Sequence, residues 1–164
     1  MGFKEIIKQL NDQQVNYIVA GGYAAIIYGV PRTTFDLDLL LDLTNENLRH
    51  FVSAIERFQY KPRVPISIYD LTDEATVKTI IQEKDAKALN LVSQTQPQID
   101  ILFNLPVSYP EAVQRCEHRS YQNLDIPILN IDDLILCKRI AGRNEDLSDI
   151  SALEIIKYQR WKDA

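Results

Sequence analysis

The stretch FDLDLLLD, residues 35–42, constrains the fold more than any other, because it places aspartates inside an apolar run. Successive side chains of a β-strand point to opposite faces of a sheet, so we predict a strand with two unlike faces. One face is entirely apolar, with Phe35, Leu37, Leu39 and Leu41. The other carries Asp36, Asp38, Leu40 and Asp42. The first face would pack on the core, and the second begins with two carboxylates.

These two carboxylates need a physical explanation. In an extended strand the Cβ atoms of Asp36 and Asp38 are about 6 to 7 Å apart, and like charges at that spacing repel unless a cation lies between them. A solvated sheet face is one explanation. Aspartate is nevertheless depleted in strands, because its side chain competes for backbone hydrogen bonds, and this favours a functional site.

A second strand repeats the pattern. In QIDILF, residues 98–103, Asp100 lies on the face opposite Ile99, Ile101 and Phe103. If the two strands are neighbours, about 4.8 Å apart, three carboxylates converge. Such hard oxygen ligands suit Mg²⁺ or Mn²⁺, and a pair of these ions supports phosphoryl or nucleotidyl transfer.

The remaining pattern predicts alternating helices and strands. Helical spacing is found over residues 3–12, 23–28, 44–56, 72–84, 109–119, 132–142 and 146–159, and strands are expected at 17–20, 35–42, 88–92, 99–103 and 125–130. The segment RCEHR, residues 115–119, is interpreted as a solvated helix face. We expect an α+β (or α/β) fold in which a mixed, mostly antiparallel sheet packs against helices, as one domain over residues 1–164.

Composition narrows the functional classes. The chain has 164 residues, 46% of them hydrophobic, and a net charge of −5, which disfavours a broad surface for long nucleic acids. Cys116 and Cys137 have no metal-ligand or redox spacing and are interpreted as reduced thiols. No segment approaches the ~20 apolar residues of a membrane span, so we expect a cytoplasmic protein without membrane contact.

A glycine pair precedes the aspartate strand. Gly21 and Gly22 lie where a strand gives way to a helix, and backbone N–H groups at such a turn can face a phosphate. A simple tight turn is the alternative explanation.

The ordered set IVAGGYAAIIYG, RTTFDLDLLLD and QIDILF resembles the nucleotidyltransferase superfamily, over about residues 16–104. The resemblance implies that Gly21 and Gly22 hold the phosphates of an NTP substrate. It also implies that Asp36 and Asp38 hold Mg²⁺ or Mn²⁺, and that Asp100 completes the metal site and helps to deprotonate the acceptor hydroxyl. Gly22 replaces the serine of many members, so a phosphate contact there would come from the backbone.

The C-terminal segment, residues 131–160, is similar to the helix pair of small bacterial members, including abortive-infection toxins and antitoxin-type relatives. Lys138 falls on the apolar wall of the predicted helix. It either extends past the helix into solvent or, as the resemblance implies, reaches the triphosphate or the acceptor. Glu145 stands where toxin-like members tend to carry lysine.

Several other polar residues lie near these motifs. Arg32 and Thr33 lie in the loop before the aspartate strand, within reach of a bound phosphate, although solvation is the usual role of a loop arginine. Arg143, Asp146 and Asp149 surround the start of the last helix, where we predict a structural role.

The sequence thus predicts a metal-dependent nucleotidyltransferase that transfers a nucleoside monophosphate to an acceptor hydroxyl. The acceptor could be a tRNA end, a partner protein or a small molecule such as an aminoglycoside. The alternative is a catalytically inactive fold that binds nucleotide or serves as a toxin-antitoxin partner. A homodimer or a partner could complete the cleft, because the chain is small for two substrates.

Overall fold

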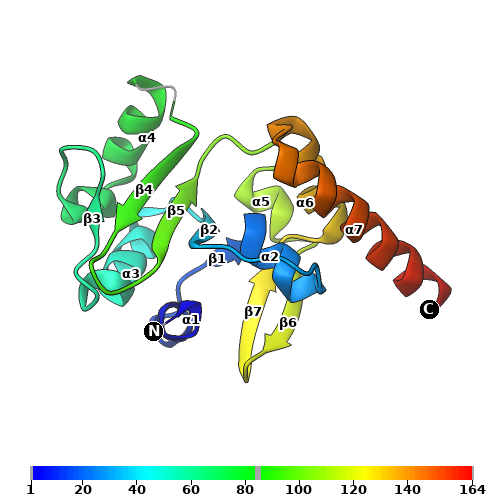
Figure 1. Cartoon of the computed structure of the whole chain (residues 1–164). Coiled ribbons are helices and arrows are strands. Elements are labelled where there is room, and N and C mark those ends of the chain that lie inside the picture. Colours follow the sequence, from blue (N-terminus) through cyan, green and yellow to red (C-terminus); the bar gives the residue numbers. More distant parts are fainter. Residues whose placement is uncertain (1, 84–85, 164) are drawn as a thin grey trace.

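The computed structural model describes residues 2–83 and 86–163. A seven-stranded sheet crosses it in the order β3-β4-β5-β2-β1-β7-β6 (Figure 1). The strands are β1 (Tyr17–Val19), β2 (Asp36–Leu41), β3 (Lys61–Pro62), β4 (Ala88–Val92), β5 (Gln98–Leu102), β6 (Glu117–Tyr121) and β7 (Leu124–Ile128). The predicted combination of a mixed sheet with helices is confirmed.

Seven α-helices and one 3₁₀ helix accompany the sheet in the described part of the chain. They are α1 (Phe3–Asp12), α2 (Gly21–Tyr28), α3 (Asn45–Glu56), η1 (Ile68–Thr72), α4 (Glu74–Glu83), α5 (Tyr109–Ala112), α6 (Ile131–Ala141) and α7 (Asn144–Lys162). Helix α1 packs on α3, whereas α2 contacts α6 and α7. Lys84, the last residue of one predicted helix, lies outside the described residues. None of the helices in residues 2–83 and 86–163 is long and apolar enough to cross a membrane.

Strand β2 lies at the centre of the sheet and links its two halves. It pairs antiparallel with β1, through Ile18 and Leu40, and parallel with β5. Leu37, Leu39 and Leu41 are buried, as the alternation predicts. Strands β4 and β5 form the predicted antiparallel pair. The sheet is therefore mixed, and its parallel β2–β5 pair brings two aspartate-bearing strands together.

The predicted apolar face is wrong at its first residue. Phe35 is 86% exposed, because β2 begins only at Asp36 and the preceding residue has no neighbouring strand to cover it.

The predicted helix over residues 109–119 is also wrong in its second half. Helix α5 ends at Ala112, and residues 117–121 form strand β6, which pairs antiparallel with β7. A turn joins the two strands at Gln122 and Asn123, both with positive φ. RCEHR therefore enters a hairpin, in which exposed and half-buried side chains alternate, rather than a solvated helix face.

A buried asparagine ties α3 to the ends of the central strands. Asn47 accepts a hydrogen bond from the Asn16 N–H at 2.6 Å. It donates hydrogen bonds to the backbone oxygens of Asn16 and Asp42 at 2.9 and 2.8 Å. Because the Asn47 side chain is buried, water cannot take its place as the hydrogen-bond partner of these backbone groups.

We expect Asn47→Ala to lower the free energy of unfolding by about 2 to 4 kcal/mol, because it leaves buried backbone groups without partners. Urea unfolding followed by circular dichroism measures this. Arg49→Ala, at an exposed position of the same helix, is the matched control and should change the free energy by less than about 0.5 kcal/mol. Equal effects of the two substitutions would contradict the role assigned to Asn47.

Candidate active site

Two of the predicted site aspartates are direct neighbours. In the parallel pairing of β2 with β5, Asp38 lies opposite Asp100 and Asp36 lies opposite Gln98. The alternation of each strand sends these side chains to the face opposite the buried leucines. The sheet register thus brings together the motifs that are 62 residues apart in the sequence. We call Asp36, Asp38 and Asp100 the carboxylate cluster.

The glycine turn is shaped around Asp38. Gly21 has a φ of +57°, and a Cβ atom there would lie 1.7 Å from Asp38 Oδ2. The Gly22 N–H donates a hydrogen bond to the Asp38 carboxylate. A Cβ at Gly22 would also lie 2.7 Å from Thr34 Oγ1. Both glycines therefore let the chain approach the aspartate strand more closely than any side chain permits, whereas their contact with a phosphate stays a prediction.

Asp38 has an unusual environment for a carboxylate. Its pKa is raised to about 6, first by burial and then by repulsion from Asp36 and Asp100. The Gly22 hydrogen bond and the positive charge of Arg143 act in the opposite direction. The ionised carboxylate is consequently destabilised in a way that a bound cation would relieve.

Amides and a hydroxyl hold the other two carboxylates. Asn90 and Gln98 donate to the same oxygen of Asp100, Oδ1, at 2.8 and 2.7 Å. Thr34 Oγ1 donates to Asp36 Oδ1 at 2.7 Å. These partners were not identified from the sequence, although simple strand alternation places Gln98 on the same face as Asp100 and Thr34 on the same side as Asp36.

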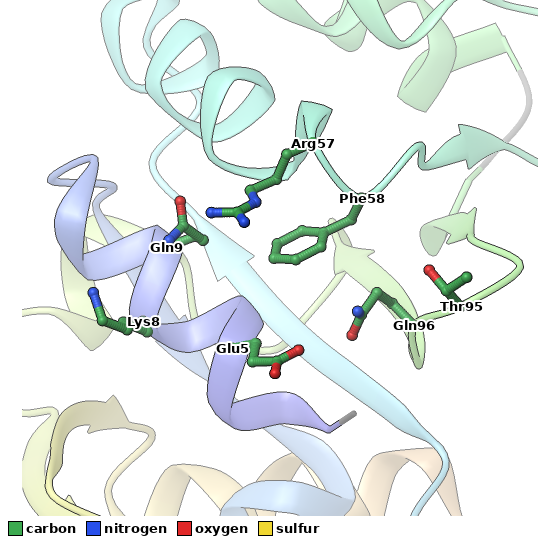
Figure 2. Close-up of a pocket in the computed structure, with 7 residues that line it drawn as sticks. All are labelled: Glu5, Lys8, Gln9, Arg57, Phe58, Thr95 and Gln96. Carbon is green, nitrogen blue, oxygen red and sulfur yellow. The ribbon is translucent and has the colours of Figure 1, made fainter.

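The carboxylate cluster opens into a cleft of about 330 Å³. The lining residues come from the glycine turn, the loop before β2, the two strands and the start of α7: Gly22, Arg32, Thr33, Thr34, Phe35, Asp36, Asp38, Asp100, Arg143 and Glu145. A larger cavity, of about 580 Å³, lies between α1, the end of α3 and the β4–β5 turn (Figure 2). It contains none of the cluster residues, so we place the candidate site in the smaller cleft.

The basic residues near the cleft are held by two buried aspartates. Arg32 pairs with Asp149, and Arg143 Nε lies 2.8 Å from Asp146 Oδ2. Lys138 Nζ is 2.7 Å from Asp149 Oδ2, and its side chain is only 3% exposed. The alternative prediction, that Lys138 extends past the helix into solvent, is therefore wrong. Its contact with a triphosphate stays a prediction. Arg143 was not predicted as a site residue, because its place at the start of α7 indicated a structural role; the structure shows that it also lines the cleft.

The donor chemistry fits a divalent cation, since three carboxylates line one cleft and repel one another at Asp38. Within the described ranges, however, no group of three acidic, histidine or cysteine side chains is arranged to hold a metal ion. Asp38 faces the glycine turn, and Asp100 faces Asn90 and Gln98. The metal ligands thus stay a prediction.

The architecture is the nucleotidyltransferase fold, and solved structures of that class align with nearly the whole chain. The lincosamide antibiotic adenylyltransferase LnuA, bound to lincomycin, aligns with a TM-score of 0.63 and 16% identity over 93% of this chain and 96% of its own. ANT(2″)-Ia in complex with adenylyl-2″-tobramycin aligns with a TM-score of 0.59 and 10% identity over 99% and 97%. TM1012 from Thermotoga maritima, a proposed nucleotidyltransferase, gives 0.59 and 15% over 98% and 90%. Identities this low show the fold alone.

The sequence match is more specific. Residues 2–163 match the family described as nucleotidyltransferase of unknown function (DUF6036), and the chain belongs to this family. No curated protein sequence matches it significantly. The predicted superfamily is confirmed.

We expect Gly21→Ala to destabilise the fold by about 2 to 4 kcal/mol, because positive φ strains alanine and its Cβ would collide with Asp38. Thermal and urea unfolding measure the change. Gly142→Ala is the matched control, since Gly142 has a similar φ of +63° and a Cβ there would meet no atom nearer than 3.8 Å, so that it reports backbone strain alone. An equal loss at both positions would contradict the proposed packing of the turn on Asp38.

The raised pKa of Asp38 predicts a pH-dependent gain of stability in Asp38→Asn. Its folded-state pKa of about 6 exceeds the usual 3.8, so the wild-type fold loses stability as the pH rises through this interval. Without added metal, Asp38→Asn should be more stable than wild type by about 1 to 3 kcal/mol at pH 7 and equally stable near pH 4. Urea unfolding at both pH values tests this, and a difference independent of pH would contradict it.

Proposed function

We propose that this chain transfers a nucleoside monophosphate from an NTP to an acceptor hydroxyl, using Mg²⁺ or Mn²⁺. The observation that carries the proposal is the register of β2 with β5, which sets Asp38 beside Asp100 in a cleft that two arginines also line. Membership of a nucleotidyltransferase family supports the same reaction class.

In this proposal Asp36, Asp38 and Asp100 hold the metal, after Asp38 and Asp100 turn from the partners that they have in the observed structure. The bound metal would supply charge neutralisation for the attacking and leaving oxygens. Asp100 accepts the proton of the acceptor hydroxyl, whose oxygen forms a bond to the α-phosphorus. The bond from the α-phosphorus to the bridging oxygen breaks, and pyrophosphate leaves.

Arg32 and Arg143 supply positive charge for the triphosphate. Both line the cleft, and guanidinium groups bind phosphate oxygens through paired N–H donors. Asp149 and Asp146 fix their directions. Lys138 is buried behind this pair, and we assign it the role of neutralising Asp149 and Asp146, from which it lies 2.7 and 3.6 Å. Lys138 would therefore act through the arginine anchors rather than touch the nucleotide.

A nucleotide-binding module without catalysis is the second candidate, as in a toxin-antitoxin partner. One arrangement favours it: two amides already donate hydrogen bonds to Asp100 Oδ1, and in the described residues no three acidic side chains are arranged to hold a metal ion. The two candidates differ in whether bound NTP is consumed.

We expect α-labelled NTP, incubated with the protein, Mg²⁺ and cell extract, to leave label in RNA, protein or a small molecule. Asp36→Asn and Asp38→Asn should each reduce transfer by about 10³-fold or more, since each removes a metal ligand. Asp42→Asn is the matched control, because Asp42 bonds the Thr44 N–H and does not line the cleft.

Calorimetry with ATP, CTP, GTP and UTP separates the remaining outcomes. Binding without transfer of label would favour the nucleotide-binding module. Absence of NTP binding to the wild-type protein with Mg²⁺ would contradict both candidates.

A further inference from the structure

The large apolar side chains that remain exposed are concentrated on the last two helices. Within the described chain, nine such side chains are exposed, and six of them lie on α6 and α7. They are Leu136, Ile140, Leu147, Ile155, Tyr158 and Trp161. Exposed apolar residues that gather on one element mark an interaction site more often than scattered single residues do.

Helix α7 carries large apolar residues on two opposite sides, together with charged ones. Asp149, Leu153 and Ile156, spaced by four and three residues, face the body of the protein and are buried or half-buried. Ile155, Tyr158 and Lys162, spaced by three and four residues, share the other side and are exposed. The last turns of α7 extend away from the sheet towards the C-terminal end (Figure 1), so this side is open to a partner.

We call Glu154, Ile155, Tyr158, Trp161 and Lys162 the outer stripe of α7. Tyr158 and Trp161 are stacked, with ring centroids 6.2 Å apart, and Lys162 Nζ lies 4.9 Å from the Tyr158 ring centre. Ser151, a small residue one turn earlier, helps Ile155 and Tyr158 to line a shallow groove of about 630 Å³. The stripe thus presents an ordered aromatic ridge next to a hollow.

The charges of the outer stripe are complementary under a two-fold rotation. Glu154 and Lys162 lie four residues before and four residues after Tyr158. Among the described residues Lys162 has no ion pair with a carboxylate, whereas Glu154 pairs with Arg139 at 2.5 Å and is still half exposed. In an antiparallel pair of helices centred on Tyr158, each Glu154 would lie opposite Lys162 of the other copy.

We propose that the outer stripe docks on the outer stripe of a second copy of this chain, antiparallel and with the two-fold axis at Tyr158. The same register sets Ile155 opposite Trp161 of the other copy, so that the indole enters the groove at Ile155. This one arrangement buries the aromatic ridge, fills the groove and pairs both charges.

The interface is small. Two exposed aromatic residues from each copy, with Ile155 and the flanking residues, bury about 1,000 Å² in total, at the low end for a specific interface. We therefore expect a reversible dimer with a dissociation constant of about 10 to 100 µM. The groove begins two turns beyond Arg143, so docking leaves the candidate site open.

Sedimentation equilibrium of the full chain, from about 5 to 500 µM, tests the proposal. Glu154→Lys and Lys162→Glu should each weaken association by about tenfold, because the two-fold axis doubles every like-charge contact. The double variant should restore the wild-type constant to within about threefold. Both Glu154→Lys and the double variant lose the Arg139 pair, so recovery can come only from contacts between copies.

Trp161→Ser should abolish the dimer, and Val113→Ser, at an exposed apolar position outside the stripe, should leave it unchanged. Circular dichroism confirms that each variant is folded. A wild-type chain that stays monomeric up to 500 µM would overturn the proposal, and the stripe would then serve a different partner. A double variant no tighter than the single variants would overturn the antiparallel register.

Discussion

The contact between Asp38 and the glycine turn determines the shape of the candidate site. Gly21 accepts a left-handed backbone conformation and has no Cβ, so Asp38 Oδ2 can occupy the space where a side chain would begin. This contact holds the start of α2 against the centre of the sheet. It also keeps a carboxylate largely buried, beside two others, with its pKa raised to about 6.

Burial of the ionised Asp38 carboxylate beside two other carboxylates lowers the stability of the fold. Residues arranged only for folding would place an amide or an apolar side chain at position 38. The fold instead surrounds the cleft with anchored cations: Asp149 and Asp146 direct Arg32 and Arg143, and Lys138 balances the two anchoring carboxylates. The carboxylates and the guanidinium groups that line the cleft are therefore held by separate partners.

Strand alternation made much of this site predictable. It placed Asp36, Asp38 and Asp100 opposite the core residues without any knowledge of the fold, and Leu37, Leu39 and Leu41 are buried as expected. The pairing of β2 with β5 was only a condition in the sequence argument, since alternation says nothing about which strands are neighbours. Arg143 was assigned only a structural role, because it reaches the cleft only through the packing of α7 on α2. Lys138 was recognisable as unusual, but its partners lie 8 and 11 residues later and depend on the α6–α7 turn.

The central claim, that the carboxylate cluster binds a metal together with a nucleotide, is tested most directly by electron paramagnetic resonance of Mn²⁺ with a non-hydrolysable NTP. The account predicts that wild-type protein and nucleotide together remove more free Mn²⁺ signal than either does alone. Asp38→Asn, which preserves the fold, should abolish this excess. Equal Mn²⁺ binding by wild type and Asp38→Asn, or no excess over nucleotide alone, would contradict it.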